Sequence, residues 1–412
     1  MKNIRFIHAA DLHLDSPFQG LRDLPEKLFH YVRESTFEAL QMLVNHAINY
    51  QVDFVVLAGD LFDGENRSLM AQAKLKKAME QLHQFGIACY IIHGNHDPLN
   101  GTWIPLSWPE NVFFFKDEVE VFEFTKNDVS VHLYGYSYPQ KIVKENIASQ
   151  FQRVGTADFH IGILHGTAEG QEGHDNYAPF SIQELVEKDF DYWALGHIHK
   201  RQILHESPFV AYSGNIQGRH SKEKGEKGVF LVELDDFKSS KLTFLPTSTL
   251  IWEELTIPIK GIETIDELKT CCETTLHDAK QCGKNVFAIL RFIGSGPLHT
   301  NLMEEIDDLV EILNWNQEEK EHFTFIVERK LETIGEWDRD QLKKEQHLLS
   351  DIVSTVDRLS IGEDPLHEVL AEVYRNQRLK RFLTPISQEQ QRQLLQEAES
   401  YILTELLKER DE

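Results

Sequence analysis

The stretch FVVLAGD, residues 54–60, contains the two features that decide the fold: a short apolar run and a polar residue directly behind it. The run is too short for a core helix and is bounded by Gly59 and Asp60, so it predicts a buried strand. Similar short runs occur on both sides of it, at Ile4–Ile7, Cys89–Ile92, His160–Leu164, Tyr192–Leu195 and Phe209–Tyr212.

Between these runs the apolar residues change to helical spacing. Residues 33–49 and 69–85 have this pattern and predict helices that cover a sheet. Short strands that alternate with helices are typical of a largely parallel sheet, so the predicted fold class up to about residue 235 is α/β.

Five of the six runs are followed by a residue that can bind a metal ion. Because ligands in open α/β sheets gather at the carboxyl ends of strands, residues far apart in the sequence can meet at one site. The predicted metal ligands are Asp11, His13, Asp60, Asn95, His165, His197 and His199.

Each motif alone has a simpler explanation, since Asp11-x-His13 and Gly59-Asp60 could be a capped turn and a helix cap. Gly94-Asn95-His96-Asp97 adds a His and an Asp that a turn does not require. His197 and His199 point to the same side if their segment is extended. The joint occurrence of these motifs favours a metal centre.

The set resembles the calcineurin-like metallophosphoesterases, and its spacing is most similar to the SbcD-type DNA repair nucleases. The segments that carry the closer resemblance are Gly59-Asp60-Leu61-Phe62-Asp63, Ser213-Gly214-Asn215 and the segment from Ala10 to Phe18, which is similar to the YhaO branch of that family. Archaeal and eukaryotic relatives usually carry His where this chain has Asp63, so the role of that His does not carry over.

The resemblance implies a sandwich of mixed sheets flanked by helices, with a site for two divalent metal ions. One would be held by Asp11, His13, Asp60 and His199, and the other by Asp60, Asn95, His165 and His197. Asp60 would bridge them, because a carboxylate has two oxygens and can span two ions. Nitrogen and oxygen ligands without thiolate suit Mn, Fe or Zn, and the family favours Mn.

His96 lies next to a ligand but outside the ligand set. We interpret it as the general acid that protonates the leaving oxygen, with Asp97 orienting its ring. The alternative is a His that merely packs beside the metal ions. His8, His30, His46, His83, His132 and His160 lie within expected strands or helices and are interpreted as packing or surface residues.

The formal net charge of −25 argues against a simple DNA-binding module, which would have a basic surface. A basic segment nevertheless follows the last metal motif. It can supply phosphate contacts or be a solvated loop, and His174, in a Gly-rich loop, can reach substrate. The candidate substrate-binding residues are His174, Arg201, Arg219, Lys222, Lys224 and Lys227, with Lys200 beside them.

The remaining chain predicts accessory domains. The 412 residues are divided into a catalytic domain (1–245), an α+β domain resembling a capping domain (246–335) and a helical region (336–412) interrupted near Pro365 and Pro385. By resemblance, this helical region binds an SbcC-like ATPase; the alternative is that it folds back on its own catalytic domain. A homodimer is expected through Leu69, Met70, Ala73, Leu82 and the segment around Trp103 and Trp108, unless these residues belong to the core.

We therefore expect a DNA nuclease beside an ATPase. The alternatives are a phosphodiesterase or phosphatase for small nucleotides or phosphoproteins, and a scaffold without activity. No apolar run reaches the roughly 18 residues of a membrane helix, so a cytoplasmic protein without membrane association is expected. Cys89, Cys271, Cys272 and Cys282 form no CxxC pair and are interpreted as reduced thiols.

Overall fold

A computed structural model describes the chain from residue 2 to residue 408, except residues 17, 19–20, 22–23, 65–67, 103, 171–175, 237–239, 281–282, 336–338, 345–347 and 361–386. By its contacts the chain divides into two compact units. The first comprises Met1–Glu253, Cys282–Phe287 and Glu318–Phe325, and the second comprises Glu254–Gln281, Ala288–Gln317 and Ile326–Glu412. The division at residues 245 and 335 stays a prediction.

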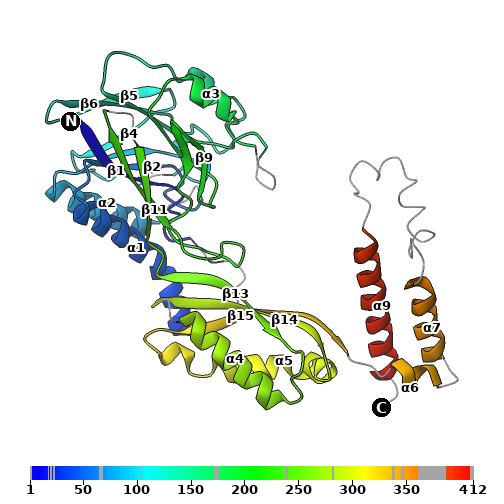
Figure 1. Ribbon diagram of the computed structural model, residues 1–412. Helices are drawn as coiled ribbons and strands as arrows, with labels where there is room; N and C mark the ends of the chain where they lie inside the picture. Colours follow the sequence, from blue (N-terminus) through cyan, green and yellow to red (C-terminus); the bar gives the residue numbers. More distant parts are fainter. Residues whose placement is uncertain are drawn as a thin grey trace. The chain divides into compact units, whose positions relative to one another are not determined.

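The first unit contains a six-stranded sheet with the order β12-β11-β1-β2-β3-β4 (Figure 1). Neighbouring strands from β1 to β4 are parallel, whereas β11 pairs antiparallel with both β1 and β12. The strands are β1 (Asn3–Ala9), β2 (Phe54–Ala58), β3 (Ala88–Ile92), β4 (Val112–Phe114), β11 (Gly228–Asp235) and β12 (Ser240–Pro246).

A second six-stranded sheet has the order β5-β6-β7-β8-β10-β9. Its middle pairs are parallel, and its two outer pairs are antiparallel. The strands are β5 (Glu120–Lys126), β6 (Val129–Gly135), β7 (Phe159–His165), β8 (Tyr192–Gly196), β9 (Gln202–Glu206) and β10 (Phe209–Tyr212).

The two sheets pack face to face, with helices on both outer faces. Phe6 of β1 lies in the apolar layer between the sheets, while the next residue, Ile7, faces the helices, as the period of a strand requires. Helices α1 (Glu26–Asn49) and α2 (Leu69–Gln84) cover the first sheet, and α3 (Ile182–Glu187) and the 3-10 helix η1 (Ile147–Gln150) contribute to the apolar cluster on the second.

The predicted α/β class and the sandwich of mixed sheets flanked by helices are confirmed. The predicted strands are present and divide between two sheets. The antiparallel strands β5 and β12 lie at edges of the two sheets. Their segments show no compact apolar run of the kind seen at residues 54–58.

A three-stranded sheet follows, with the order β13-β14-β15. It consists of β13 (Leu250–Pro258), β14 (Asn285–Gly296) and β15 (Thr324–Gly335), and helices α4 (Ile265–Lys280) and α5 (His299–Asn314) contribute to its apolar cluster; η2 (Gln317–Glu319) is a short 3-10 turn. The predicted α+β character of this region is therefore present. Beyond it the described part of the chain forms the helices α6 (Arg339–Lys344), α7 (Leu348–Ser360) and α9 (Gln388–Lys408).

The residues predicted for a dimer face differ in exposure. Leu69 and Met70 on α2 are 54% and 60% exposed, and Ala73 is also exposed. Leu82 is fully buried in the core beneath α2, so assigning it to an interface was wrong, and Trp108 packs on the same core. Trp103 lies outside the described residues.

Two further expectations concern thiols and membranes. Cys89, Cys271 and Cys272 are free thiols, and Cys282 lies outside the described residues. Among the helices that the structure describes, none is both long enough and apolar enough to cross a membrane.

Candidate metal centre

The predicted metal ligands come together at the carboxyl ends of five parallel strands. Asp11 and His13 follow β1, Asp60 follows β2, and Asn95 follows β3 of the first sheet. From the second sheet, His165 ends β7, while His197 and His199 follow β8. Both sheets therefore contribute side chains to one site.

The backbone at this edge adopts conformations that L-residues rarely take. Asp11, His13, Asp60 and His197 all have positive φ, at 52°, 43°, 50° and 100°. Such residues cost on the order of 1–3 kcal/mol each and cluster at functional sites, where the surrounding structure holds them. The segment that follows β1 is hydrogen-bonded to the segment that follows β2, because His13 N donates to Asp60 O at 3.0 Å.

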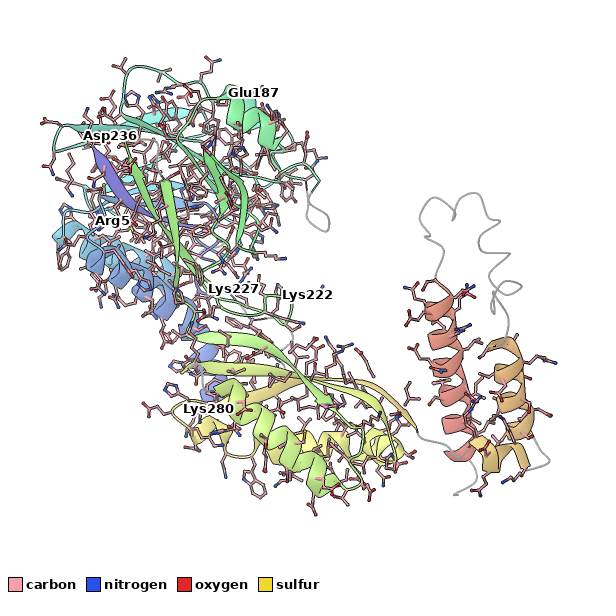
Figure 2. All side chains as sticks on the ribbon, in the orientation of Figure 1. Arg5, Glu187, Lys222, Lys227, Asp236 and Lys280 are labelled. Atoms are coloured by element: carbon pink, nitrogen blue, oxygen red, sulfur yellow. The ribbon has the colours of Figure 1, made fainter. Side chains whose placement is uncertain are left out.

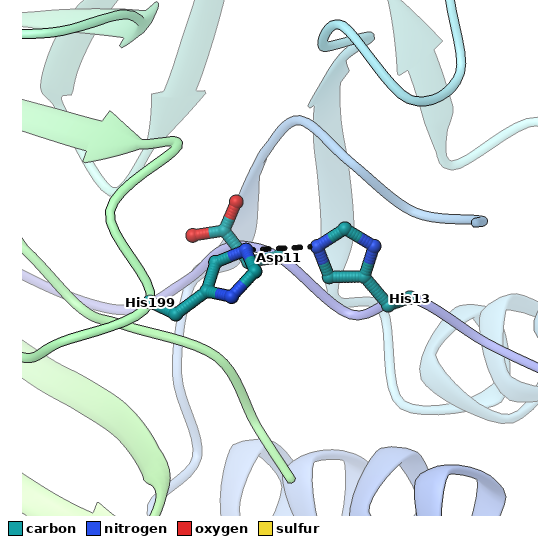
Figure 3. A group of neighbouring side chains, drawn as sticks. All are labelled: Asp11, His13 and His199. Carbon is teal, nitrogen blue, oxygen red and sulfur yellow. Dashed lines mark hydrogen bonds between the residues drawn. The ribbon is translucent and has the colours of Figure 1, made fainter. Parts of the chain in front are cut away.

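One half of the site consists of Asp11, His13 and His199 and is called the His199 half here. The Nε2 atoms of His13 and His199 lie 3.1 Å apart, and the Asp11 carboxylate lies beside them (Figure 3). Imidazole nitrogens bind ions such as zinc at about 2.1 Å, which places two adjacent ligands of one ion about 3.0 to 3.4 Å apart in octahedral or tetrahedral coordination. The observed separation fits a shared ion.

The other half, called the His165 half, consists of Asn95, His165 and His197. The amide oxygen of Asn95 lies 3.0 Å from His165 Nε2 and 3.0 Å from His197 Nδ1, which is the same spacing. Asp60 faces both halves: its Oδ2 is 3.4 Å from His165 Nε2 and 3.8 Å from His13 Nε2. Its Oδ1 accepts a hydrogen bond from His96 N at 2.9 Å.

Two glycines leave the room that these side chains occupy. A Cβ at Gly94 would lie 2.3 Å from Asp60 Oδ1 and 2.7 Å from His165 Nε2. At Gly59, which has a φ of 89°, a Cβ would lie 2.4 Å from His165 Nδ1. The glycines of the sequence motifs therefore allow close packing of the predicted ligands.

The electrostatics of the centre require positive charge. Burial raises the pKa of Asp11, opposed by His199 and His165. Burial also opposes ionisation of Asp60, yet His165 and His13 hold its pKa well below the usual value. Burial lowers the pKa of His165 too, but Asp60 outweighs it and raises that pKa to about 9. Two buried carboxylates need a nearby cation, and a metal ion meets that need.

His96 lies at the edge of the centre, and its side chain is 37% exposed. Its Nδ1 lies 2.9 Å from Asp63 Oδ1, so Asp63 holds its ring. Asp97 is buried and accepts hydrogen bonds from the backbone N–H groups of Leu61 and Gly94 while contacting His93. The prediction that Asp97 orients His96 is therefore wrong, because the Asp97 side chain points into the turn.

Two carboxylates near the centre were given no role from the sequence: Asp63 was named only as a departure from the relatives, and Glu223 was not named. Asp63 accepts a hydrogen bond from Ser16 Oγ at 2.9 Å and lies near His96 and His13. Glu223 Oε1 is 2.6 Å from His199 Nδ1. Asp63 could have been found as the second acidic residue of the GDLFD segment. Glu223 lies between lysines, so its segment was interpreted as basic.

The candidate substrate-binding side chains have different surroundings. Arg219 is buried, and its Nη1 donates to Ser16 Oγ at 2.8 Å, while the Arg201 guanidinium lies 3.5 Å above the Phe244 ring centre. Lys222 and Lys224 are exposed, and burial lowers the pKa of Lys227. Figure 2 marks Lys222 and Lys227 on the loop before β11. His174 lies outside the described residues.

Two family models and several known proteins resemble this chain. Residues 4–201 match the calcineurin-like phosphoesterases, and residues 252–333 match the middle domain of metallophosphoesterase YhaO. The chain is 38% identical over 411 residues to the uncharacterized metallophosphoesterase YhaO of Bacillus subtilis (strain 168), and the match covers 98% of each chain.

More distant similarity extends to two proteins with DNA-related names. The SbcD component of nuclease SbcCD from Staphylococcus epidermidis is 26% identical, over 60% of this chain and 70% of that protein. DNA double-strand break repair protein Mre11 of Methanocaldococcus jannaschii is 25% identical, over 69% of this chain and 73% of that protein.

Proposed function

Because this chain belongs to the calcineurin-like metallophosphoesterases and carries a YhaO-type middle domain, we propose that it is a two-metal nuclease that hydrolyses phosphodiester bonds of DNA. The family supports a metal-dependent phosphoesterase, and DNA as the substrate is our proposal. The observation that carries it is the position of Asp60 Oδ2 between the nitrogens of the two halves of the site.

In this proposal Asp11, His13, Asp60 and His199 hold one ion, and Asp60, Asn95, His165 and His197 hold the other. When bound, two divalent ions supply Lewis-acid chemistry that polarises the phosphoryl group and makes water more acidic. Two bound divalent ions would outweigh the charges of the ligands Asp11 and Asp60 and leave this ligand set at about +2. That charge would attract a phosphodiester to an acidic protein. Mn is the proposed metal, with Fe or Zn as alternatives.

His96 is the proposed general acid. Because a carboxylate only accepts hydrogen bonds, Asp63 fixes the proton of His96 on Nδ1 and orients the ring. In the protonated ring, Nε2 carries a second proton. That proton passes to the leaving oxygen, and the ring is left neutral with its proton on Nδ1. Asp63 is therefore a positioning residue in this proposal, in the role that the sequence suggested for Asp97.

The relatives named for DNA repair and nuclease activity support DNA as the substrate. The cationic side chains of Arg201, Lys222 and Lys224, followed by Lys227, would contact backbone phosphates, which position a nucleic acid without reading its sequence. Arg219 and His174 are also retained as proposed contacts. The net charge of −25 makes a partner for DNA binding useful, and we propose an SbcC-like ATPase for that role.

We also propose that the chain forms a homodimer. The exposed side chains of Leu69 and Met70 at the start of α2 would lie in the interface. Light scattering at micromolar concentration checks this, since the monomer has a mass of 47.8 kDa. A measured mass equal to that of the monomer contradicts the dimer.

The decisive experiment digests end-labelled single-stranded, double-stranded and hairpin DNA in the presence of Mn. Bis-nitrophenyl phosphate and small nucleotides are run beside it. The Asp60→Asn variant should lose activity and contain well below two metal ions per chain, because the charge facing both ions is removed. Asp117→Asn, on an exposed residue, is the matched control.

The outcomes of this experiment separate the candidate functions. Cleavage of DNA by the parent chain, lost in Asp60→Asn, supports the nuclease. Turnover of small esters without any DNA cleavage would favour the small-nucleotide phosphodiesterase instead. An Asp60→Asn variant that keeps two metal ions and full activity would refute the bridging role of Asp60.

A further inference from the structure

A buried carboxylate lies directly behind one of the proposed metal ligands. Glu223 is 5% exposed, and its Oε1 is 2.6 Å from Nδ1 of His199. His220 Nε2 lies 3.4 Å from the same oxygen. The basic side chains around Glu223 in the sequence therefore surround a residue that faces inward, toward the centre.

The contact fixes the tautomer of His199. An ionised carboxylate accepts hydrogen bonds and donates none, so Nδ1 of His199 must carry the proton in this bond. The lone pair is then on Nε2, which is the atom that faces Nε2 of His13 at 3.1 Å. A metal ion binds the unprotonated nitrogen of an imidazole, so the contact with Glu223 presents His199 in the form that binds metal.

The surrounding segment holds Glu223 in place. Its Oε2 accepts hydrogen bonds from Arg219 N at 2.7 Å and from Asn215 Nδ2 at 3.0 Å. The backbone of this segment also contacts His199, because Asn215 N donates to His199 O at 3.3 Å. Gly214 has a φ of 75°, and a Cβ there would lie 2.8 Å from His199 O. The Ser213-Gly214-Asn215 motif thus packs behind this metal ligand.

The two halves of the site differ in this respect. In the His165 half, Nδ1 of His165 lies 2.9 Å from the backbone oxygen of Ala58, a neutral acceptor that no side-chain substitution removes. Glu223, by contrast, contacts a ligand of the His199 half. A substitution at Glu223 should therefore weaken binding of one ion and leave binding of the other unchanged.

We propose that Glu223 is a positioning residue for metal binding in the His199 half, acting through the tautomer and orientation of His199. This inference rests on the proposed two-metal function. Loss of such an outer carboxylate typically weakens metal binding by about 10- to 100-fold. The expected consequence is selective weakening of the ion held by Asp11, His13 and His199.

The test compares Mn binding by the full-length parent chain and by Glu223→Gln, using titration calorimetry and elemental analysis. We expect one of two ions to bind about 10- to 100-fold more weakly and the other to bind unchanged. At limiting Mn, the electron paramagnetic resonance spectrum should show an isolated Mn(II) ion in place of a spin-coupled pair. His220→Ala is the matched control, because His220 lies 3.4 Å from the same Glu223 oxygen and is not a proposed ligand. This variant should bind both ions normally.

A merely structural role predicts different results. Glu223→Gln would then lower the melting temperature of the metal-free chain and weaken both ions together, which would overturn the proposal, as would unchanged binding of both. If that variant does not fold, Asn215→Ala loosens Glu223 without altering His199, and it must show the same loss confined to one ion. A parent chain that binds fewer than two ions contradicts the two-metal function itself, which a loss seen only in the variants does not.

Discussion

His96 combines contact with the centre and access to solvent. Asp63 holds its Nδ1, and its ring centre lies 5.0 Å from that of His13. If His96 protonates the leaving group, His96→Ala should keep both metal ions and lose about 10²- to 10⁴-fold in the rate of DNA cleavage. The loss should be much smaller with bis-nitrophenyl phosphate, because nitrophenolate leaves without a proton.

Rates with both substrates, beside metal content and DNA affinity, check this role for His96. His220→Ala serves as a control on another half-buried His near the centre. Equal losses on both substrates would exclude leaving-group protonation. Loss of metal from His96→Ala would identify the residue as a ligand or a support of the ligands.

The contacts around single residues show where sequence reasoning stops. The order and strand positions of Asp11, Asp60 and His165 were readable, because each follows an apolar run. The sequence did not show whether Asp97 or Asp63 is the partner of His96. The answer depends on the turn after β3, in which Asp97 binds backbone N–H groups while Asp63 arrives from the neighbouring strand end.

At the level of elements, His8 joins the two sheets. From β1 its Nε2 donates to Leu195 O at 3.1 Å, and its Nδ1 accepts from the Tyr192 hydroxyl on β8 at 2.9 Å. A neutral imidazole makes both bonds when its proton is on Nε2. The expectation that His8 is a packing residue is confirmed by its full burial.

This contact predicts loss of stability in acid. Burial lowers the pKa of His8 from 6.5 to about 3, opposed by the bond to Leu195 O. Below pH 6.5 the unfolded chain binds a proton that folded His8 excludes. The free energy of unfolding should therefore fall by about 1.4 kcal/mol for each pH unit between 6.5 and 3 from this residue, and the contribution is fully present above 6.5.

Urea unfolding at several pH values measures this dependence. His8→Gln should have a shallower slope below pH 6.5 than the parent chain, whatever its stability at pH 7. His83→Gln, on an exposed residue of α2, should keep the parent slope. Equal slopes for His8→Gln and the parent chain would show that His8 is protonated in the folded protein or does not control acid unfolding.

The pairing of elements was less predictable than their existence. Residues 54–58 are buried on both faces and read directly as a strand. β11 begins at Gly228, far from β1 in the sequence, yet lies beside it in the sheet. Composition and periodicity carry no information on such distant pairing, so they predicted the strands but not the pairing of β11 with β1.

At the level of the whole molecule, the helices after the α+β region share a small apolar cluster. Leu342, Leu349, Val353 and Leu403 form it, with Ile352 and Leu406 packed against it. Arg339 Nη2 also joins α7 and α9 through Asp357 at 2.7 Å and Glu399 at 3.0 Å. These contacts bury only part of the helices' apolar surface. Pro365 and Pro385 lie outside the described residues.

The remaining apolar surface on these helices is the basis of the last prediction. Leu348 on α7 is 60% exposed, and Leu394, Tyr401 and Ile402 on α9 are 45%, 70% and 41% exposed. Amphipathic helices owe most of their stability to packing of the apolar face, so a partner is expected to cover it. We propose that this surface binds the SbcC-like ATPase.

Removing residues 336–412 should leave hydrolysis of bis-nitrophenyl phosphate unchanged, because the proposed ligands all lie between Asp11 and His199. The same truncation should abolish co-purification with the ATPase and its stimulation of DNA cleavage. A full-length chain carrying Leu394→Glu and Tyr401→Glu is the matched variant, since it alters exposed positions and should lose the partner while staying folded. If the truncated chain still binds the ATPase, or if it unfolds, the helices belong to the core of the protein and do not form a docking surface.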